Sequence, residues 1–398
     1  MSQQQQPAGL CSIRIDLILL PGGRFVKRCP PPAVTGFRLQ YKESMKCLQV
    51  GLVGFGFAGR IFHANAIEAV EGLEVAAIVQ RTGDEAALVF PHAKIVRTVE
   101  ELLEDTSIRL VVVATPNATH LPIARQCLLA GRDVVVDKPF ALNSEEAAEL
   151  IQLARAQGRL LSVYQNRRWD GDFRTVRKLV DNERMGRLVM FESHYDRFRQ
   201  LPRLHAWREN GGPGGGVLFD LGAHLVDQAM VLFGVPTGIW ASVRMEREGA
   251  QSDDAFDLCL QYPSTGLTVW LRATCLARAP GARFTLNGTQ GTFRKYGMDP
   301  QEALLLAGDK FSSKPWGVEA ADHWGTLTTD EGEPVDTRIP TEPGDYRCYY
   351  INIRDAMHGN AAVAVTPLQA WRTIRVLEMA LQSSRSGSTI TCDWSIEP

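Results

Sequence analysis

Apolar runs of strand length alternate with helix-like segments between residues 48 and 165. Runs at residues 48–53, 73–79, 110–114 and 134–136 each lead into a turn rich in glycine or polar residues. Strands that alternate with helices at this spacing imply right-handed crossovers and a parallel sheet. The turns at the carboxyl ends of the strands then line one edge of the sheet, where sheets of this kind bind ligands.

The pattern changes in the second half of the chain, where apolar and polar positions alternate with period two. Such runs, joined by short turns, predict one large antiparallel or mixed sheet. The predicted fold is therefore α/β: a Rossmann-type, doubly wound parallel sheet over residues 45–165, then an α+β domain with a large open, mostly antiparallel sheet over residues 166–398. The strands expected in the second domain are 188–194, 239–247, 255–262, 267–275 and 283–287.

Composition narrows the function classes. The 398 residues are 45% hydrophobic and 22% charged, as in a globular protein of two or three domains. A formal net charge of -2 without a basic stripe argues against a nucleic-acid or membrane partner, and no apolar run approaches the roughly 20 residues that span a bilayer. The eight cysteines lack the close spacing of zinc or redox motifs, so we expect reduced, mostly buried thiols, no metal and a cytoplasmic protein.

Residues 1–44 differ in composition from the rest. They hold a glutamine run, several basic residues against few acidic ones, and the triple proline Pro30-Pro31-Pro32. Consecutive prolines do not form the amphipathic helix of a transit peptide. We expect a disordered or artefactual extension, with the folded protein beginning at Met45.

The first strand leads into Gly54-Phe55-Gly56-Phe57-Ala58-Gly59, and helical periodicity follows. This is the spacing of a dinucleotide-binding fingerprint. Gly54 permits the tight turn, Gly56 lets the backbone approach a pyrophosphate, and Gly59 allows close helix packing. The free amides and positive potential of the helix N-terminus favour the same anion. The structural alternative is a plain glycine turn.

The second strand ends in Gln80-Arg81-Thr82. NAD-specific sites carry an acid about 20 residues beyond the fingerprint, where it binds the ribose 2′-hydroxyl. A carboxylate would repel a 2′-phosphate, whereas Arg81 and Thr82 offer a guanidinium fork and a hydroxyl that bind one. The sequence therefore favours NADP over NAD.

Two further strand ends carry polar side chains, in residues 115–120 and 137–139. A buried β-branched strand has no structural need for a lysine at its end, so Lys138 is expected to point at the bound ligand. The structural alternative is a solvated lysine that begins a loop, and for His120 it is a histidine at a helix start. The cofactor contacts expected here are Thr115, Pro116, Asn117, His120, Asp137 and Lys138.

Asp220, His224 and Asp227 follow a glycine-rich stretch at residues 211–216. On a helix, Asp220 and His224 share a face one turn apart, with Asp227 on the same side. A carboxylate beside an imidazole is an acid-base pair in which the carboxylate orients the ring and favours its protonated form. The structural alternative is that Asp220 caps the helix and His224 is a core histidine. The helix is expected to end near Gly234.

Residues 54–59, 137–139 and 220–224 together resemble the glucose-fructose oxidoreductase / inositol dehydrogenase / rhizopine catabolism (Gfo/Idh/MocA) family of NAD(P)-dependent oxidoreductases. The likeness covers about residue 45 to the C-terminus. Residues 166–170, 207–209 and 296–301 are similar to a bacterial branch that includes NADP-dependent scyllo-inositol dehydrogenases. The family commonly has a glutamate before its lysine and proline; this chain has Asp137, as that branch does.

The resemblance implies hydride transfer between a secondary alcohol of an inositol-like polyol or sugar and NADP. By it, His224 is the general base, Asp220 assists it and positions the substrate, and Lys138 contacts the reacting hydroxyl. Other contacts follow from the same likeness. Trp207 and Arg208 are implied as cofactor or domain-closing contacts, and Asn166 and Arg168 as substrate or cofactor contacts or, alternatively, as interdomain salt-bridge residues.

Two other functions stay open. Some family members bind the cofactor and act as regulators without catalysis; loss of the lysine or of the acid-histidine pair would mark them, and this chain keeps all three residues. Another chemistry on the same scaffold, such as imine reduction or dihydrodiol oxidation, is also open because fold does not decide substrate. The resemblance further implies a homodimer or homotetramer that buries an apolar face of the second sheet.

Overall fold

The computed structural model describes residues 17–19, 25–27, 47–203, 206–313, 315–330 and 332–398, and the chain divides into two units, Met1–Met45 and Lys46–Pro398. In the first unit, β1 (Leu17–Leu19) and β2 (Phe25–Lys27) pair antiparallel. The rest of the extension predicted for residues 1–44 lies outside the described residues. In the described part of the chain, no helix has the length and hydropathy of a membrane-spanning segment.

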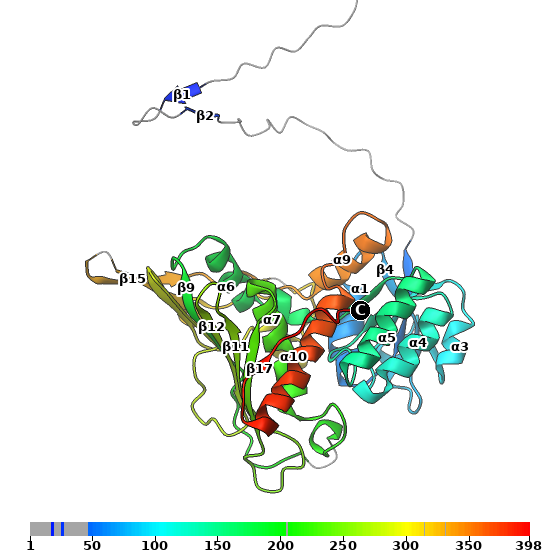
Figure 1. The fold of residues 1–398 in the computed structure, drawn as a ribbon. Helices are drawn as coiled ribbons and strands as arrows, with labels where there is room; N and C mark the ends of the chain where they lie inside the picture. The colour runs from blue at the N-terminus through cyan, green and yellow to red at the C-terminus, as the bar shows by residue number, and fades with distance from the viewer. Residues whose placement is uncertain (1–16, 20–24, 28–46, 204–205, 314, 331) are drawn as a thin grey trace, which may run out of the picture. The chain divides into compact units, whose positions relative to one another are not determined.

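The first sheet of the second unit is parallel, as predicted, with six strands in the order β5-β4-β3-β6-β7-β8. Strands β6 and β7 are almost wholly buried because helices cover the sheet (Figure 1). The sequence did not predict β5, a three-residue edge strand with an exposed lysine and no apolar run. The bounds are β3 Leu48–Val53, β4 Leu73–Val79, β5 Lys94–Val96, β6 Ile108–Val113, β7 Asp133–Val136 and β8 Leu161–Val163.

Local signals fix the helices between these strands. The Asn143 side chain accepts a hydrogen bond from the Glu146 amide at the start of α5, and Gly158 ends that helix with φ of 59°. After the fingerprint the chain first forms a π-helical segment, η1, and then α1. The helices are η1 Gly59–Ala64, α1 Asn65–Glu68, α2 Glu85–Val89, α3 Val99–Leu103, η2 Asn117–Thr119, α4 His120–Leu129 and α5 Ser144–Gln157.

The second sheet has nine strands in the order β16-β15-β14-β13-β9-β12-β11-β10-β17. Only β9 and β12 pair parallel, so the predicted mixed, mostly antiparallel sheet is confirmed. Strands β14 to β17 were not predicted: β16 is exposed, β17 has two residues, and β14 and β15 each hold a single large apolar residue among polar ones. The bounds are β9 Leu188–His194, β10 Gly238–Arg244, β11 Ala255–Tyr262, β12 Leu267–Thr274, β13 Phe284–Gly288, β14 Gly291–Lys295, β15 Gly325–Asp330, β16 Pro334–Ile339 and β17 Ile390–Thr391.

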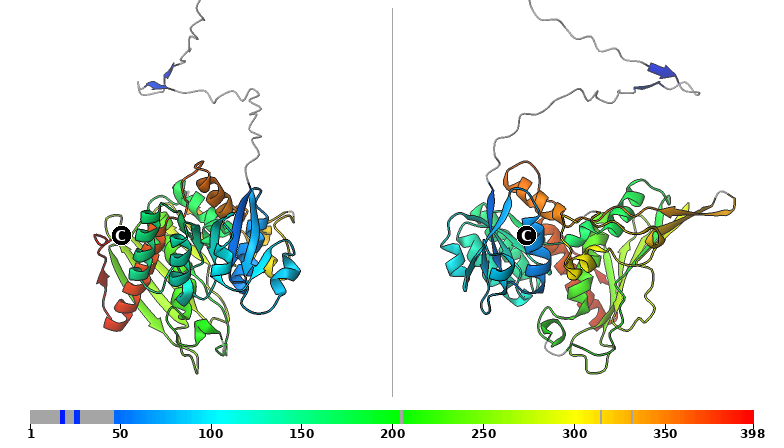
Figure 2. Two further views of the ribbon diagram at one scale, coloured as in Figure 1. Left: turned by 90° about the vertical axis from the view of Figure 1, so that its right-hand side faces the viewer. Right: turned by 180° about the vertical axis from the view of Figure 1, so that it is seen from behind.

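Helices cover one face of this second sheet (Figures 1 and 2). The long helix α10 begins with a capping box formed by Thr366 and Gln369. It packs against both β10 and α5, and the Trp371 indole donates to the Ser144 carbonyl, so the last helix ties the second sheet to the first. The remaining helices are η3 Asn166–Trp169, α6 Gly171–Asp181, η4 Trp207–Glu209, η5 Leu218–Gly222, α7 Ala223–Phe233, α8 Gln301–Ala307, η6 Ala321–His323, α9 Arg347–Met357 and α10 Pro367–Ser386.

Candidate functional site

The carboxyl ends of β3, β4 and β6 open onto a cavity of about 570 Å³. The fold thus brings together three turns that the sequence marked separately: the fingerprint, the end of the second strand and the end of the third. Of the predicted residues, those that line the cavity are Gly54, Phe55, Gly56, Arg81, Thr82, Thr115 and Pro116.

The three fingerprint glycines meet different requirements. Gly54 has φ of +99°, and a Cβ there would lie 2.7 Å from the Ala114 carbonyl oxygen. A Cβ at Gly59 would overlap the Gly54 carbonyl oxygen, so this glycine allows the helix to pack on the turn. A Cβ at Gly56 would meet nothing within 4 Å. The backbone at Gly56 therefore faces open space, as the approach of a pyrophosphate requires. Phe57 and Ala58 lead into η1.

An arginine that the sequence did not single out shapes the loop after β4. Arg97 donates to the Gln80 and Gly83 carbonyls at 2.8 and 2.7 Å and pairs with Asp84 at 2.7 Å. Arg97 follows the edge strand β5, so finding that strand would have pointed to it. Among the described residues, no group forms an ion pair with Arg81, which leaves its guanidinium free to bind a phosphate.

Asn117 and His120 lie beneath the turns rather than at the cavity wall. The Asn117 amide donates to the Gly214 carbonyl at 2.8 Å, which ties the β6 turn to the glycine-rich loop. The buried His120 ring lies 3.0 Å from the Pro139 oxygen and 2.9 Å from the Thr115 oxygen. His120 thereby bridges two strand-end turns, and the structure supports an indirect role for it, since both ring nitrogens meet main-chain oxygens.

Lys138 reaches across to the second domain. Its ammonium donates to the Asp220 main-chain oxygen at 2.8 Å and to the Asp220 carboxylate at 3.1 Å. Its side chain is only 15% exposed, so the alternative of a solvated loop lysine does not hold. Lys138, from the end of β7, and Asp220, from η5, therefore form an ion pair.

Asp220 is held by three cations. Burial raises the pKa of its carboxyl, but the charges of Lys138, Arg208 and Arg197 outweigh burial and hold the pKa far below its usual range. Arg208 Nε lies 3.3 Å from one carboxylate oxygen, and Arg197 Nη2 lies 3.8 Å from the other. Asp220 is therefore an anion that orients Lys138 and the two arginines.

His224 differs from the prediction. Burial, and then the positive charges of Lys138, Arg167, Arg283 and Arg208, hold its pKa well below the usual value. The ring is therefore neutral, whereas the sequence predicted an imidazolium favoured by Asp220. Among the described residues, no hydrogen bond joins Asp220 to His224, and the buried Nδ1 has no partner. A neutral imidazole is the form that can accept a proton.

The backbone explains why the predicted pair does not form. Asp220 lies in η5, which is wound as a π-helix, and the α-helix begins only at Ala223. The wider π-helical turn removes the i,i+4 stacking that an α-helix gives. The helix then ends at Phe233 with Gly234 as its cap, as predicted.

Arg168 and Asp227 form a salt bridge, but both residues lie in the predicted second domain, so it is not the interdomain bridge that was the alternative for Arg168. The guanidinium donates to both carboxylate oxygens at 2.7 and 2.6 Å, and its third nitrogen donates to the Ala364 carbonyl at 2.9 Å. These protein acceptors engage all three nitrogens. Asn166 is buried in η3.

Trp207 and Arg208 lie together in η4. The guanidinium of Arg208 stacks on the Trp207 ring at 4.3 Å and points to Asp220. Sequence reasoning missed Arg197, Arg167 and Arg283, which supply positive charge around Asp220 and His224. Arg167 directly precedes the predicted Arg168, but no sequence motif indicates Arg197 or Arg283.

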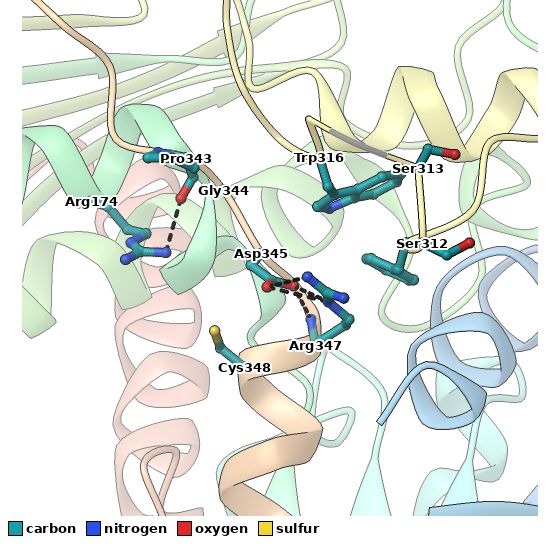
Figure 3. Close-up of a pocket in the computed structure, with 10 residues that line it drawn as sticks. Arg174, Ser312, Ser313, Trp316, Pro343, Gly344, Asp345, Arg347 and Cys348 are labelled. Atoms are coloured by element: carbon teal, nitrogen blue, oxygen red, sulfur yellow. Dashed lines mark hydrogen bonds and ion pairs between the residues drawn. The ribbon is translucent and has the colours of Figure 1, made fainter. Parts of the chain in front are cut away.

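A second cavity, of about 500 Å³, shares no lining residue with the first. Figure 3 shows that its charged groups already have partners: Arg347 pairs with Asp345, and Arg174 donates to the Pro343 carbonyl at 2.9 Å. Aromatic rings of Phe311 and Trp316 form part of its wall.

The cysteines of the described residues do not line the first cavity. The six cysteines in the described ranges are free: Cys127, Cys259 and Cys275 are buried, Cys47 is exposed, and Cys348 and Cys392 are half-buried. Three of these six cysteines are therefore buried, where the sequence predicted that most would be. Cys11 and Cys29 lie outside the described residues. Within the same ranges, no group of three or more His, Cys, Asp or Glu side chains is arranged to hold a metal ion.

Known proteins are similar to this chain in sequence and fold. YdgJ of Escherichia coli (strain K12), an uncharacterised oxidoreductase, is 41% identical over 344 residues, which cover 86% of this chain and 98% of YdgJ. IolW of Bacillus subtilis (strain 168), named scyllo-inositol 2-dehydrogenase (NADP(+)), is 36% identical over 354 residues, which cover 88% of this chain and 98% of IolW. The structure of yvaA from Bacillus subtilis matches with a TM-score of 0.85 at 34% identity, over 88% of this chain and 100% of that one.

Family models cover most of the chain. One described as an oxidoreductase family with an NAD-binding Rossmann fold matches residues 48–165. Another, described as the C-terminal alpha/beta domain of an oxidoreductase family, matches residues 177–392. The chain belongs to the Gfo/Idh/MocA family of oxidoreductases and carries its NAD(P)-binding Rossmann domain.

Proposed function

We propose that the protein transfers a hydride between NADP and a secondary alcohol of an inositol-like polyol or sugar. One observation carries this proposal: Lys138, at the same carboxyl edge of the parallel sheet as the fingerprint turn, pairs with the anionic Asp220 and acts on the pKa of a neutral, buried His224. A proton acceptor and a cation beside a nicotinamide site are the groups that oxidation of an alcohol needs.

Each residue has its own role in this scheme. His224 takes the proton of the reacting hydroxyl, because burial and the surrounding cations keep its ring uncharged and a neutral imidazole has a nitrogen that can accept a proton. Lys138 stabilises the negative charge that develops on the hydroxyl oxygen. Asp220 holds the Lys138 ammonium by two hydrogen bonds and so fixes its direction. Bound NADP supplies the redox chemistry by accepting the hydride.

NADP is proposed over NAD because Arg81 and Thr82 line the cavity at the end of β4. A guanidinium and a hydroxyl there suit a 2′-phosphate. The printed name of IolW, which includes NADP(+), supports the same cofactor. The residues present fit NADP, because the space beside Gly56 is open and the fingerprint residues form part of the cavity wall.

The polyol class rests on the similarity to IolW, and a relative of lower identity is named for a different substrate, a dihydrodiol. Trans-1,2-dihydrobenzene-1,2-diol dehydrogenase of Mus musculus is 27% identical over 245 residues, 61% of this chain. A diol of that kind also presents a secondary alcohol to a base, so the same site geometry serves it. The retained Lys138, Asp220 and His224 argue against a catalytically silent regulator.

A panel of polyols, sugars and a dihydrodiol, offered with NADP and with NAD, tests the proposal through the absorbance of the reduced nicotinamide. We expect turnover with at least one inositol or sugar and a lower KM for NADP. Turnover confined to the dihydrodiol would replace the substrate class. A lower KM for NAD would overturn the cofactor assignment, and no turnover on the whole panel would overturn the activity.

We also propose a cytoplasmic homodimer or homotetramer that associates through the open face of the nine-stranded sheet. Trp240 and Trp270 pack edge to face there, with ring centroids 6.1 Å apart. The same face is more polar than the sequence predicted, because Arg272 pairs with both Asp257 and Glu192. Light scattering tests the assembly: a monomer at micromolar concentration would refute it.

A further inference from the structure

His63, which no sequence motif marked, is fully buried beside the turn that carries Lys138. Its Nε2 lies 3.5 Å from Asp137 Oδ1, and its Nδ1 lies 2.5 Å from the Tyr350 hydroxyl. The Tyr164 ring lies against it, with centroids 4.2 Å apart. Segments from η1, from the ends of β7 and β8 and from α9 therefore meet at one imidazole.

The tautomer of the His63 ring sets the direction of its hydrogen bond with Tyr350. The Asp137 carboxylate that faces Nε2 can only accept, so the tautomer that suits this site carries its proton on Nε2, and the Tyr350 hydroxyl then donates to Nδ1. A neutral ring that accepts at Nδ1 carries its proton on Nε2. Among the described residues, the buried Nε2 has no hydrogen-bond partner, and the group that faces it is the Asp137 carboxylate at 3.5 Å. The order is therefore Tyr350 to His63 to Asp137.

Asp137 passes this contact on to the backbone of Lys138. The same Oδ1 that faces His63 accepts the Lys138 main-chain N–H at 2.8 Å. On the other side of the turn, His120 lies 3.0 Å from the Pro139 carbonyl oxygen. The main chain on either side of Lys138 thus has two polar contacts. One is with Asp137, which faces His63, and the other is with His120.

We propose that His63 is a positioning residue: it holds Asp137 and, through Asp137, the main chain from which Lys138 reaches Asp220. This inference rests on the proposed function, in which Lys138 stabilises the reacting oxygen.

The charge of Asp137 depends on its partners. Burial raises the pKa of its carboxyl, but the contact with His63 and the positive charge of Lys138 outweigh burial and hold that pKa below the usual range. The phenols of Tyr164, Tyr349 and Tyr350 complete the titratable groups around it. Without His63, burial has less to oppose it, so the carboxyl pKa should rise.

Two substitutions separate the two contacts of the imidazole. In His63→Gln, the terminal amide nitrogen reaches about as far as Nε2 and can still donate to Asp137. In His63→Asn, the shorter amide keeps a polar atom near Tyr350 but loses Asp137. His92→Asn is the matched control, because His92 is an exposed histidine of the same domain that pairs with Glu68.

The first measurement needs no substrate: the Asp137 carboxyl is titrated by carbon NMR of aspartate-labelled protein, with Asp137→Asn giving the assignment. We expect His63→Asn to raise the Asp137 pKa, and His63→Gln and His92→Asn to leave it near the wild-type value. An unchanged Asp137 titration in His63→Asn would overturn the inference. If neither His63 variant folds, Tyr350→Phe removes one hydroxyl and should shift the titration the same way; no shift would again overturn it.

The second measurement is kcat against pH. His63→Asn should lose about 10- to 100-fold in kcat, the scale of a small misplacement of a catalytic group, and its acid limb should move to higher pH. NADPH affinity, read by fluorescence, should stay within twofold of wild type. Equal losses in His63→Asn and His63→Gln with an unchanged Asp137 titration would reduce His63 to a packing role. A protein that shows the titration shift but oxidises no alcohol would overturn the proposed function alone.

Discussion

The Arg168 guanidinium donates two hydrogen bonds to the Asp227 carboxylate, at 2.7 and 2.6 Å, and both side chains are almost fully buried. Removing one partner of such a pair leaves a buried charge without compensation, at a cost of about 3–5 kcal/mol. Asp227→Asn should therefore lower the free energy of unfolding by that amount, measured by urea denaturation.

The control for this prediction is Asp181→Asn. Asp181 pairs with Arg177 on the surface of α6, with side chains 63% and 60% exposed. Exposed pairs contribute about 0–1 kcal/mol, so this variant should unfold almost as the wild type does. Equal unfolding free energies for the two variants would show that the Arg168 pair contributes no more than a surface pair.

Burial of His224, together with the positive charge around it, sets the pH range in which the proposed base works. Because its pKa lies well below the usual value of about 6.5, the ring stays neutral and able to accept a proton through neutral pH. The acid limb of kcat/KM for alcohol oxidation should therefore lie below about pH 6.5. Arg208→Gln removes one of the cations, so it should raise the pKa of His224 and move the acid limb to higher pH. Arg109→Gln, at an exposed position of β6, should not move it.

The turnover test for the same site uses alanine. Lys138→Ala and His224→Ala should each lower kcat by about 10²- to 10⁴-fold, as expected for loss of a proton-transfer or charge-stabilising group. NADPH binding should stay close to wild type in both. Near-normal kcat in either variant would contradict the role given to that residue.

The sequence predicted the elements that have strong local patterns and missed those that depend on distant partners. The buried runs of β3, β4, β6 and β7 and the fingerprint turn were readable, since burial and glycine spacing are local. The edge strand β5 and the exposed β16 have no apolar run. The π-helical turn at η5 changed the expected geometry of Asp220 and His224, because a periodicity of 3.6 residues was assumed.

The polar contacts of the site also depend on partners that are distant in the sequence, so they could not be predicted from it. Lys138 was expected from its place at a strand end, but its contact with Asp220 joins residues 82 positions apart. His63 and Tyr350 are 287 positions apart, and nothing in either local segment indicates the other. Such pairs become visible only when the fold has brought their elements together.

Arg81 should decide between the two nicotinamide cofactors. A hydrogen bond to a charged group contributes about 1.5–3 kcal/mol. Arg81→Gln should therefore raise the KM for NADP about 10- to 100-fold while the KM for NAD changes little. Arg125→Gln serves as the control, because Arg125 forms a surface pair with Glu149. Parallel changes in both KM values for Arg81→Gln would mean that the guanidinium does not meet a 2′-phosphate.

The fingerprint glycines offer a test that separates folding from cofactor binding. A Cβ at Gly56 would meet nothing within 4 Å, so Gly56→Ala should keep the wild-type Tm but place a methyl group where the pyrophosphate is proposed to approach. A Cβ at Gly59 would overlap the Gly54 carbonyl oxygen, so Gly59→Ala must displace the helix and should lower Tm. Thermal unfolding with and without NADPH measures both. We expect Gly56→Ala to lose most of the stabilisation that NADPH gives to the wild type, and full retention of that stabilisation would show that the cofactor does not pass over Gly56.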